Sequence, residues 1–107
     1  MTDSSYPDGA VVHTVIIAWR PGSVDSLFVE RVSSELREVA TECDGVLDYR
    51  IGSDLGWHPD NGDFAVTAVF ADPAAFNAYA SNDKHVRIAT EDLLPNAERH
   101  LGIQFEI

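Results

Sequence analysis

The sequence predicts a single α+β domain with the element order β-α-β-β-α-β and a four-stranded antiparallel sheet. Three observations lead to this class. Short runs rich in β-branched and aromatic residues alternate with stretches whose apolar residues recur at helical spacing. The chain has 107 residues, the size of one domain. Residues 1–9 are polar and contain Ser, Pro, Asp and Gly, so we expect a flexible tail there and the domain over 10–107.

The run 11–19 is the first strand. It is rich in Val and Ile and nearly apolar on both alternating faces, which is typical of a central strand covered on both sides. The stretch 24–41 then changes to helical periodicity, and Ser23 or Asp25 can cap its first turn. We interpret the apolar stripe of this helix as core packing. The residues of the stripe are Val24, Phe28, Val32, Leu36 and Val39.

The remaining elements follow from alternation, turn residues and capping signals. Leu47, Tyr49 and Ile51 are expected to share one face of the second strand. Asp72 followed by Pro73 is a typical helix start, because a carboxylate caps the first turn and proline fits the first helical position. In chain order we expect strand 46–53, loop 54–62, strand 64–71, helix 72–80, helix 83–94 and strand 102–107.

This element order is that of the ferredoxin-like fold. Its helices cover only one face of the sheet, yet the strand 11–19 is apolar on both faces. A monomer of this size buries only about two-thirds of the surface of its unfolded chain, so covering the second face would add stability. A second copy of the same sheet is the simplest cover. The sequence therefore predicts a homodimeric α+β barrel.

The charge and the cysteine content limit the classes of partner and the cellular compartment that we expect. Seven Lys and Arg against 18 Asp and Glu give a net charge of −11, which repels phosphate backbones and anionic lipid surfaces. We therefore expect neither a nucleic acid nor a membrane as partner. No apolar run is long enough for a membrane span, and the polar start of the chain does not resemble a signal peptide. With Cys43 alone no internal disulfide can form, and a cytoplasmic location is expected.

Three passages resemble the stress-responsive A/B barrel family, also called Dabb. The passage 12–22 resembles its opening strand, with a His, aliphatic residues, an aromatic residue, a basic residue and a Pro-Gly turn. The passage 45–54 resembles its second strand. The passage 64–85 resembles its third strand and the helix that follows, although 82–85 keeps only the last His of an H-P-x-H-like segment. The resemblance covers about 10–107 and implies a homodimer whose two sheets close into a barrel.

The resemblance also implies candidate catalytic residues. One member of the family, olivetolic acid cyclase, closes a linear polyketide without a metal or organic cofactor, using a Tyr and a His about six residues apart. Tyr79 and His85 match those positions, and His13 matches a pocket His on the first strand. In a dry pocket His85 could take an acidic proton between two carbonyls while Tyr79 holds one carbonyl. Arg31 and Glu35 stand where the cyclase has aromatic residues, which favours a smaller or more polar ligand.

Each candidate also has a structural interpretation. His85 could cap a helix or lie in an interface, and His13 could be a core residue bonded to a neighbour such as Tyr79. The chain is then either a cofactor-independent enzyme, cyclase-like or lyase-like, acting on a small carbonyl compound, or a non-catalytic stress-responsive dimer. A cofactor-free monooxygenase, as found in a related barrel superfamily, is a third alternative. No cofactor is expected.

Other chemistry-bearing residues receive weaker assignments. The histidines and carboxylates show none of the usual metal-ligand spacings, so no metal site is expected. Cys43 lies between Glu42 and Asp44, whose charges disfavour a thiolate. In the polar loop, Trp57 and His58 could cover a pocket mouth, grip a partner subunit, or belong to an ordinary loop.

Overall fold

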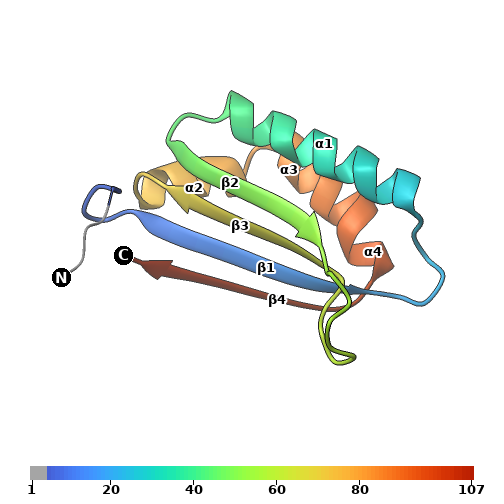
Figure 1. The fold of residues 1–107 in the computed structure, drawn as a ribbon. Coiled ribbons are helices and arrows are strands. Elements are labelled where there is room, and N and C mark those ends of the chain that lie inside the picture. The colour runs from blue at the N-terminus through green and yellow to red at the C-terminus, as the bar shows by residue number, and fades with distance from the viewer. Residues whose placement is uncertain (1–4) are drawn as a thin grey trace.

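The structure, a computed structural model, describes residues 5–107 and consists of one sheet with helices on one face (Figure 1). The sheet order is β2-β3-β1-β4, and every neighbouring pair is antiparallel, which confirms the predicted ferredoxin-like α+β class. The strands are β1 (Val11–Trp19), β2 (Val46–Ser53), β3 (Phe64–Phe70) and β4 (Ala97–Glu106). Of the tail expected over 1–9, residues 1–4 lie outside the described residues.

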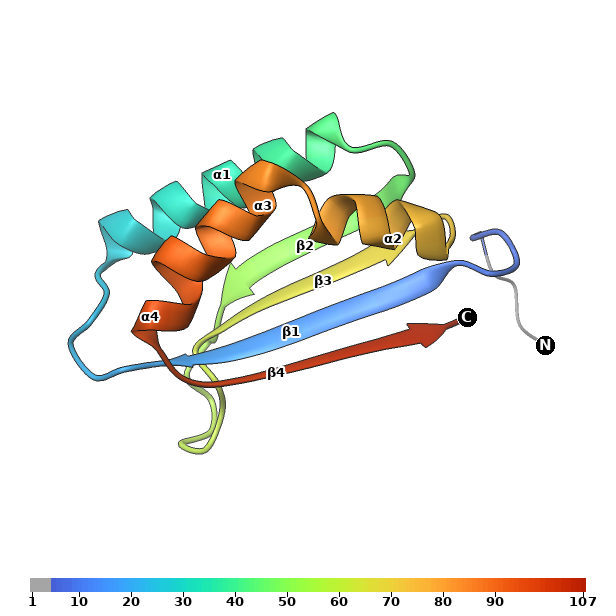
Figure 2. The same ribbon diagram turned by 180° about the vertical axis from the view of Figure 1, so that it is seen from behind.

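The helices form a layer on one side of this sheet. In Figure 2, α1 lies beside the run from α3 to α4, and α2 precedes that run above the other end of the sheet. The helices are α1 (Ser26–Glu42), α2 (Pro73–Ala80), α3 (Asp83–Arg87), the π-helical η1 (Ile88–Leu93) and α4 (Leu94–Asn96). The single helix expected over 83–94 is thus three consecutive elements. None of the described helices combines the length and apolar character that crossing a bilayer requires.

Two aspartates start the two longest helices. The Asp25 carboxylate accepts the backbone N–H of Phe28 at 2.9 Å, and Asp72 does the same for Ala75 at 2.8 Å. Asp25, rather than Ser23, is therefore the cap of α1. The Ser23 hydroxyl instead donates to the backbone of Asn96 at 3.3 Å, which ties the start of α1 to the end of α4.

The prediction that Leu47 shares a face of β2 with Tyr49 and Ile51 is wrong. The pairing of β2 with β3 shifts between Val46 and Asp48, so Leu47 is an extra residue in a β-bulge. A bulge interrupts the two-residue alternation of side chains. As a result Val46 packs toward the core together with Tyr49 and Ile51, while Leu47 is 45% exposed.

The last strand begins earlier than expected, at Ala97 rather than at residue 102. Its first residues pair with the end of β1, with a register irregularity between Ala18 and Trp19. Consecutive polar residues, Glu98 to His100, hide this part of the strand from an alternation argument. The pairing partner rather than the local pattern makes it a strand.

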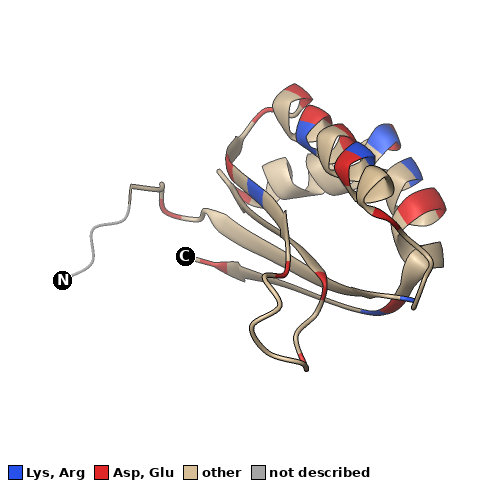
Figure 3. Cartoon of the chain, turned by 45° about the vertical axis from the view of Figure 1, so that its right-hand side comes forward, with Lys and Arg blue, Asp and Glu red and all other residues tan. Residues whose placement is uncertain are grey.

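The two faces of the sheet differ sharply in burial. The helix-covered face holds the core, formed by Val11, Ile17, Val32, Leu36, Val39, Phe64, Val66, Ala68, Phe70, Tyr79, Ile88 and Ala97. The other face carries Leu101, Ile103 and Phe105 of β4, which are 73%, 58% and 53% exposed. Their register partners on β1, Ile16 among them, lie on the same face. We call this surface the open face. Figure 3 shows that most charged positions lie on helices and loops and few on the middle of the sheet.

Gly45 allows α2 to approach the turn before β2, and replacing it should be costly. It has a φ of +82°, and an added Cβ would lie 2.6 Å from the Cβ of Ala75. Gly22 has a similar φ of +71° with nothing within 4 Å. We expect Gly22→Ala to lower the free energy of unfolding by about 1 kcal/mol, from backbone strain alone. Gly45→Ala should lower it by roughly 2 to 4 kcal/mol, because overpacking adds to that strain.

Urea unfolding of both variants at one protein concentration measures this difference. Equal losses for the two variants would contradict the close approach at Gly45.

Candidate active site

Two histidines and two tyrosines meet between the sheet and the helices. His13 comes from β1, Tyr49 from β2, Tyr79 from the end of α2 and His85 from α3. Tyr79 is central: its ring centroid lies 4.4 Å from that of His85, 5.8 Å from that of Tyr49 and 6.2 Å from that of His13. We call these four residues the interior cluster. The structure thus brings together all three residues that the family resemblance singled out.

The break between α2 and α3 places Tyr79 and His85 side by side. The side-chain oxygen of Asn82 accepts the backbone N–H groups of Lys84 and His85, at 3.0 and 3.1 Å, and so starts α3 after the chain has turned. The ring of His85 is fixed in turn by Nδ1, which lies 3.2 Å from the carbonyl oxygen of Ala80. A carbonyl only accepts, so in the neutral ring Nδ1 carries the proton and Nε2 keeps its lone pair.

His13 has the opposite arrangement of its ring nitrogens. The side-chain amide nitrogen of Gln104 lies 2.9 Å from Nδ1 of His13. An amide nitrogen donates, so Nδ1 accepts and the neutral ring carries its proton on Nε2. The partner of His13 is therefore Gln104 and not Tyr79, which contacts it edge to face. Sequence reasoning missed Gln104, although the β1–β4 register places it directly opposite His13.

A hydrogen bond of 2.7 Å joins the hydroxyls of Tyr49 and Tyr79. Burial raises the pKa of Tyr49 to about 12. Burial raises the pKa of Tyr79 further, and the neighbouring Tyr49 adds to the effect. Both hydroxyls are therefore protonated at neutral pH. Tyr49 is a second residue that sequence reasoning did not assign to the site, because nothing in its spacing links it to Tyr79.

The two imidazoles are held in their neutral forms. Burial lowers the pKa of His13 below its ordinary value, and the nearby His85 lowers it further. Burial also lowers the pKa of His85, partly opposed by the carbonyl of Ala80. Three groups are therefore available around the Tyr79 phenol: the Nε2 lone pair of His85, the Nε2–H of His13 and the protonated hydroxyl of Tyr79. This set can accept a proton and stabilise a developing oxyanion.

Arg31 and Glu35 do not contribute to the interior cluster. Arg31 pairs with Glu35 at 3.3 Å and with Asp92 of η1 at 3.1 Å. These contacts place both residues at the outer seam between α1 and η1, because the core side of α1 is taken by its apolar stripe. Their charged groups therefore pair with each other and with Asp92, and with no residue of the interior cluster. In the part of the chain that the structure describes, no three His, Cys, Asp or Glu residues form a group able to hold a metal ion.

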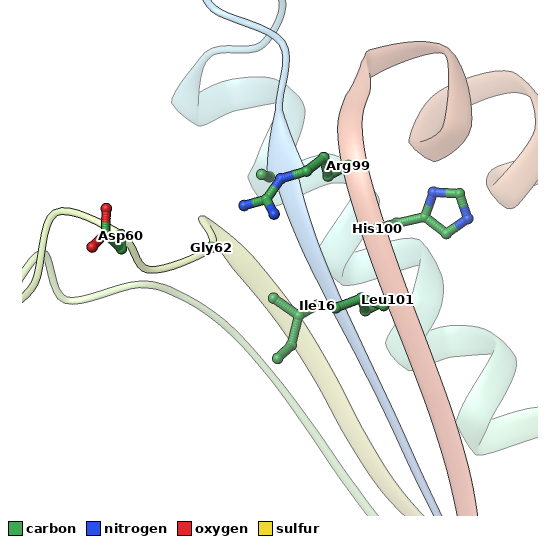
Figure 4. Close-up of a pocket in the computed structure, with 7 residues that line it drawn as sticks. Ile16, Asp60, Gly62, Arg99, His100 and Leu101 are labelled. Carbon is green, nitrogen blue, oxygen red and sulfur yellow. The ribbon is translucent and has the colours of Figure 1, made fainter.

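A separate hollow of about 560 Å³ lies on the open face, beneath the β2–β3 loop. We call it the rim hollow. Figure 4 shows the guanidinium of Arg99 over β1, on the side of Asp60, while the ring of His100 points away from the loop. The lining residues are Ile16, Ala18, Asp60, Gly62, Arg99, His100 and Leu101. Trp57 and His58 lie on the same loop and are exposed, unlike the buried Tyr79 and His13 of the interior cluster.

Comparison with solved structures agrees with the fold. A dimeric ferredoxin-like protein of unknown function from Thermobifida fusca is 24% identical, with a TM-score of 0.84, over 98% of this chain and 97% of that chain. A Dabb family protein from Mesorhizobium loti is also 24% identical, with a TM-score of 0.73, over 92% and 97% of the two chains. A hydroxynitrile lyase from Passiflora edulis is 17% identical, with a TM-score of 0.79, over 94% and 95%.

No match was found among curated proteins. A model of the stress-responsive A/B barrel domain, by contrast, matches residues 11–107, which is nearly the whole chain. The match includes all four strands and all the helices of the structure. The chain therefore belongs to the stress-responsive A/B barrel (Dabb) domain family.

Proposed function

We propose that this protein is a homodimer that binds a small carbonyl compound at the interior cluster and removes a proton from it without a cofactor. His85 is the general base, Tyr79 orients the carbonyl, and His13 supports the developing charge. One observation carries the proposal: the Nδ1 bond to Ala80 leaves the lone pair on Nε2 of His85, in a ring that stacks on Tyr79. Burial keeps that ring neutral at physiological pH.

The chemistry uses only groups of the cluster. Nε2 of His85 takes the proton of a C–H bond that lies between two carbonyls, and the electron pair of that bond moves into an enolate. The carbonyl of Ala80 continues to accept Nδ1–H and so stabilises the imidazolium. The hydroxyl of Tyr79 or the Nε2–H of His13 donates to the enolate oxygen. When the enolate carbon attacks a second carbonyl, the imidazolium gives its proton to the alkoxide that forms. When the enolate instead expels a leaving group, the leaving group takes that proton.

Access to this site is expected at the junction of α2 and α3. His85 is half-buried there, whereas Tyr79 and His13 are only 1% and 8% exposed. A small ligand would meet the base first and reach the phenol by displacing its neighbours. A hydroxynitrile lyase of the same fold supports a lyase-type reaction as an alternative outcome at this site.

A second candidate is a non-catalytic dimer in which the cluster only packs. One observation favours it: among the described residues, no buried side-chain nitrogen or oxygen lacks a hydrogen-bond partner. The two tyrosines satisfy each other, and each imidazole has its own partner. A fully satisfied polar interior rigidifies a small domain without any ligand.

The dimer itself is supported by the open face. Ile16, Leu101, Ile103 and Phe105 form a contiguous apolar surface there, and each is about half exposed or more. Such a patch is typical of an interface between subunits. Solved relatives are described as dimeric.

We further propose the domain boundaries 10–107 and a cytoplasmic location. We also propose that nucleic acid is not a partner, because the chain carries a net charge of −11.

Proton abstraction can be tested without knowing the natural substrate. In D₂O, we expect the wild type to accelerate exchange of the central C–H protons of pentane-2,4-dione, followed by NMR. His85→Ala should reduce the catalysed rate by about 100-fold or more, the usual contribution of a general base. His58→Ala, in the exposed loop, is the matched control and should exchange like the wild type. An active His85→Ala, or a wild type no faster than buffer, would favour the non-catalytic dimer.

Stability should fall on the acid side of neutrality. The pKa values of His13 and His85 are lowered in the folded chain, so below about pH 6.5 the unfolded chain binds more protons. The stabilisation is present above that pH and is lost as the pH drops toward the folded pKa values. Urea unfolding between pH 7.5 and 5 should show this loss, and His13→Gln should reduce its size. A stability independent of pH over this range would contradict neutral buried rings.

The open face can be tested by oligomeric state. We expect sedimentation to report a dimer for the wild type, and Ile103→Glu to weaken the dimer by about 100-fold or more, since a carboxylate would be buried without a partner. Leu27→Glu, at a more exposed apolar position on α1, should leave the dimer intact. A wild type that stays monomeric at high concentration would overturn the homodimer.

A further inference from the structure

We propose that the β2–β3 loop, residues 54–62, is an arm that grips the second copy of the chain, with Leu55 and Trp57 buried against that copy. This inference rests on the proposed homodimer and goes beyond it, because it assigns the arm and its two apolar residues to the interface. Four features support it: the anchoring of the arm, its exposed apolar side chains, its direction, and the rim hollow beneath it.

The base of the arm is fixed to β1. The backbone N–H of Asp63 donates to the carbonyl of Ile17 at 2.8 Å, and the Asp63 carboxylate accepts the N–H of Trp19 at 2.7 Å. The N–H of Asp54 donates to the carbonyl of Asp63, also at 2.8 Å, which closes the loop. Both ends of the arm are therefore tied to the sheet.

The inner side of the arm is also ordered by hydrogen bonds. The Asp54 carboxylate accepts the N–H of Gly56 at 2.8 Å and the side-chain amide of Asn61 at 3.1 Å. A loop ordered in advance loses little conformational entropy on binding, which favours affinity. Asp54 and Asn61 thus bond within the arm, while Leu55 and Trp57 remain exposed.

Leu55 and Trp57 are the apolar side chains that the arm presents. They are 71% and 77% exposed. The ordered backbone holds them in solvent rather than against their own core, so covering them is favourable. Tryptophan is also the residue type most often responsible for binding energy at protein interfaces. Leu55 and Trp57 therefore form a small apolar surface that an apolar partner would cover.

The direction of the arm identifies the partner as a second copy. In Figures 1, 2 and 3 the arm projects from the sheet on the side away from the helices. The open face with Leu101, Ile103 and Phe105 lies on that same side. A second sheet that covers the open face would therefore lie alongside the arm, which carries Leu55 and Trp57.

The rim hollow gives the second copy a place to enter. Its floor is apolar, with Ile16, Ala18 and Leu101, and it lies between the arm and the sheet. At its edge the guanidinium of Arg99 forms no side-chain hydrogen bond or ion pair with another residue in the described range 5–107.

The test uses Trp57 as its own reporter. The chain has two tryptophans, so Trp19→Phe leaves Trp57 alone. Acrylamide quenching and emission of this variant are recorded across a dilution series in which sedimentation reports the oligomer. We expect emission to shift to shorter wavelength, and quenching to fall, as the dimer forms.

Each outcome decides the inference. A dimer in which Trp57 is quenched as in the monomer overturns the arm and leaves the homodimer standing. A chain that never dimerises overturns both.

A second variant covers the case in which Trp19→Phe fails to fold, since Trp19 packs on Phe28 and Phe64. Trp57→Ser in the otherwise native chain should raise the dimer dissociation constant by about 10-fold or more, as expected for an interface residue of large effect. Leu27→Ser removes an equally exposed apolar side chain from α1 and should change it less than about 2-fold. Equal dissociation constants for the two variants would overturn the arm.

Discussion

The architecture depends on one constraint: a four-stranded sheet with apolar residues on both faces and helices for only one of them. The helices bury Phe64, Val66, Ala68 and Phe70 of β3, which alternate with residues that face the other way. The same alternation on β4 leaves Leu101, Ile103 and Phe105 in solvent. A chain of this size has little stability to spare. The open face is therefore the reason to expect a second copy of the chain. The proposed role of the β2–β3 loop, contact with that copy, follows from it.

The covered face has its own distinctive feature, a small polar cluster inside an apolar core. Tyr79 is 1% exposed and hydrogen-bonded to Tyr49, and its ring contacts those of His13 and His85. The backbone acceptor at Ala80 and the amide of Gln104 give the two histidines opposite tautomers. A pair of neutral imidazoles with complementary nitrogens is an uncommon way to fill a core, and it is chemically useful. The same contacts would also stabilise a protein without activity. An activity measurement therefore distinguishes a catalytic cluster from one that only packs.

Much of the fold could be predicted from the sequence, and the failures have physical causes. Runs of β-branched and other apolar residues located β1 and β3, and Asp72 with Pro73 located the start of α2, because these signals are local. The bulge at Leu47 and the early start of β4 depend on pairing with another strand, which local patterns do not carry. The family resemblance named three cluster residues. It did not name Gln104, whose role arises from its register opposite His13, or Tyr49, whose role arises from the packing of α2 on β2.

The central claim is that His85 is a neutral base whose free nitrogen is Nε2. Long-range ¹H–¹⁵N NMR of the imidazole nitrogens, recorded as the pH is varied, tests it most directly. We predict that His85 carries its proton on Nδ1 and titrates with a pKa below the ordinary histidine value of about 6.5. A ring protonated on Nε2, or one whose pKa lies at or above that ordinary value, would contradict this assignment.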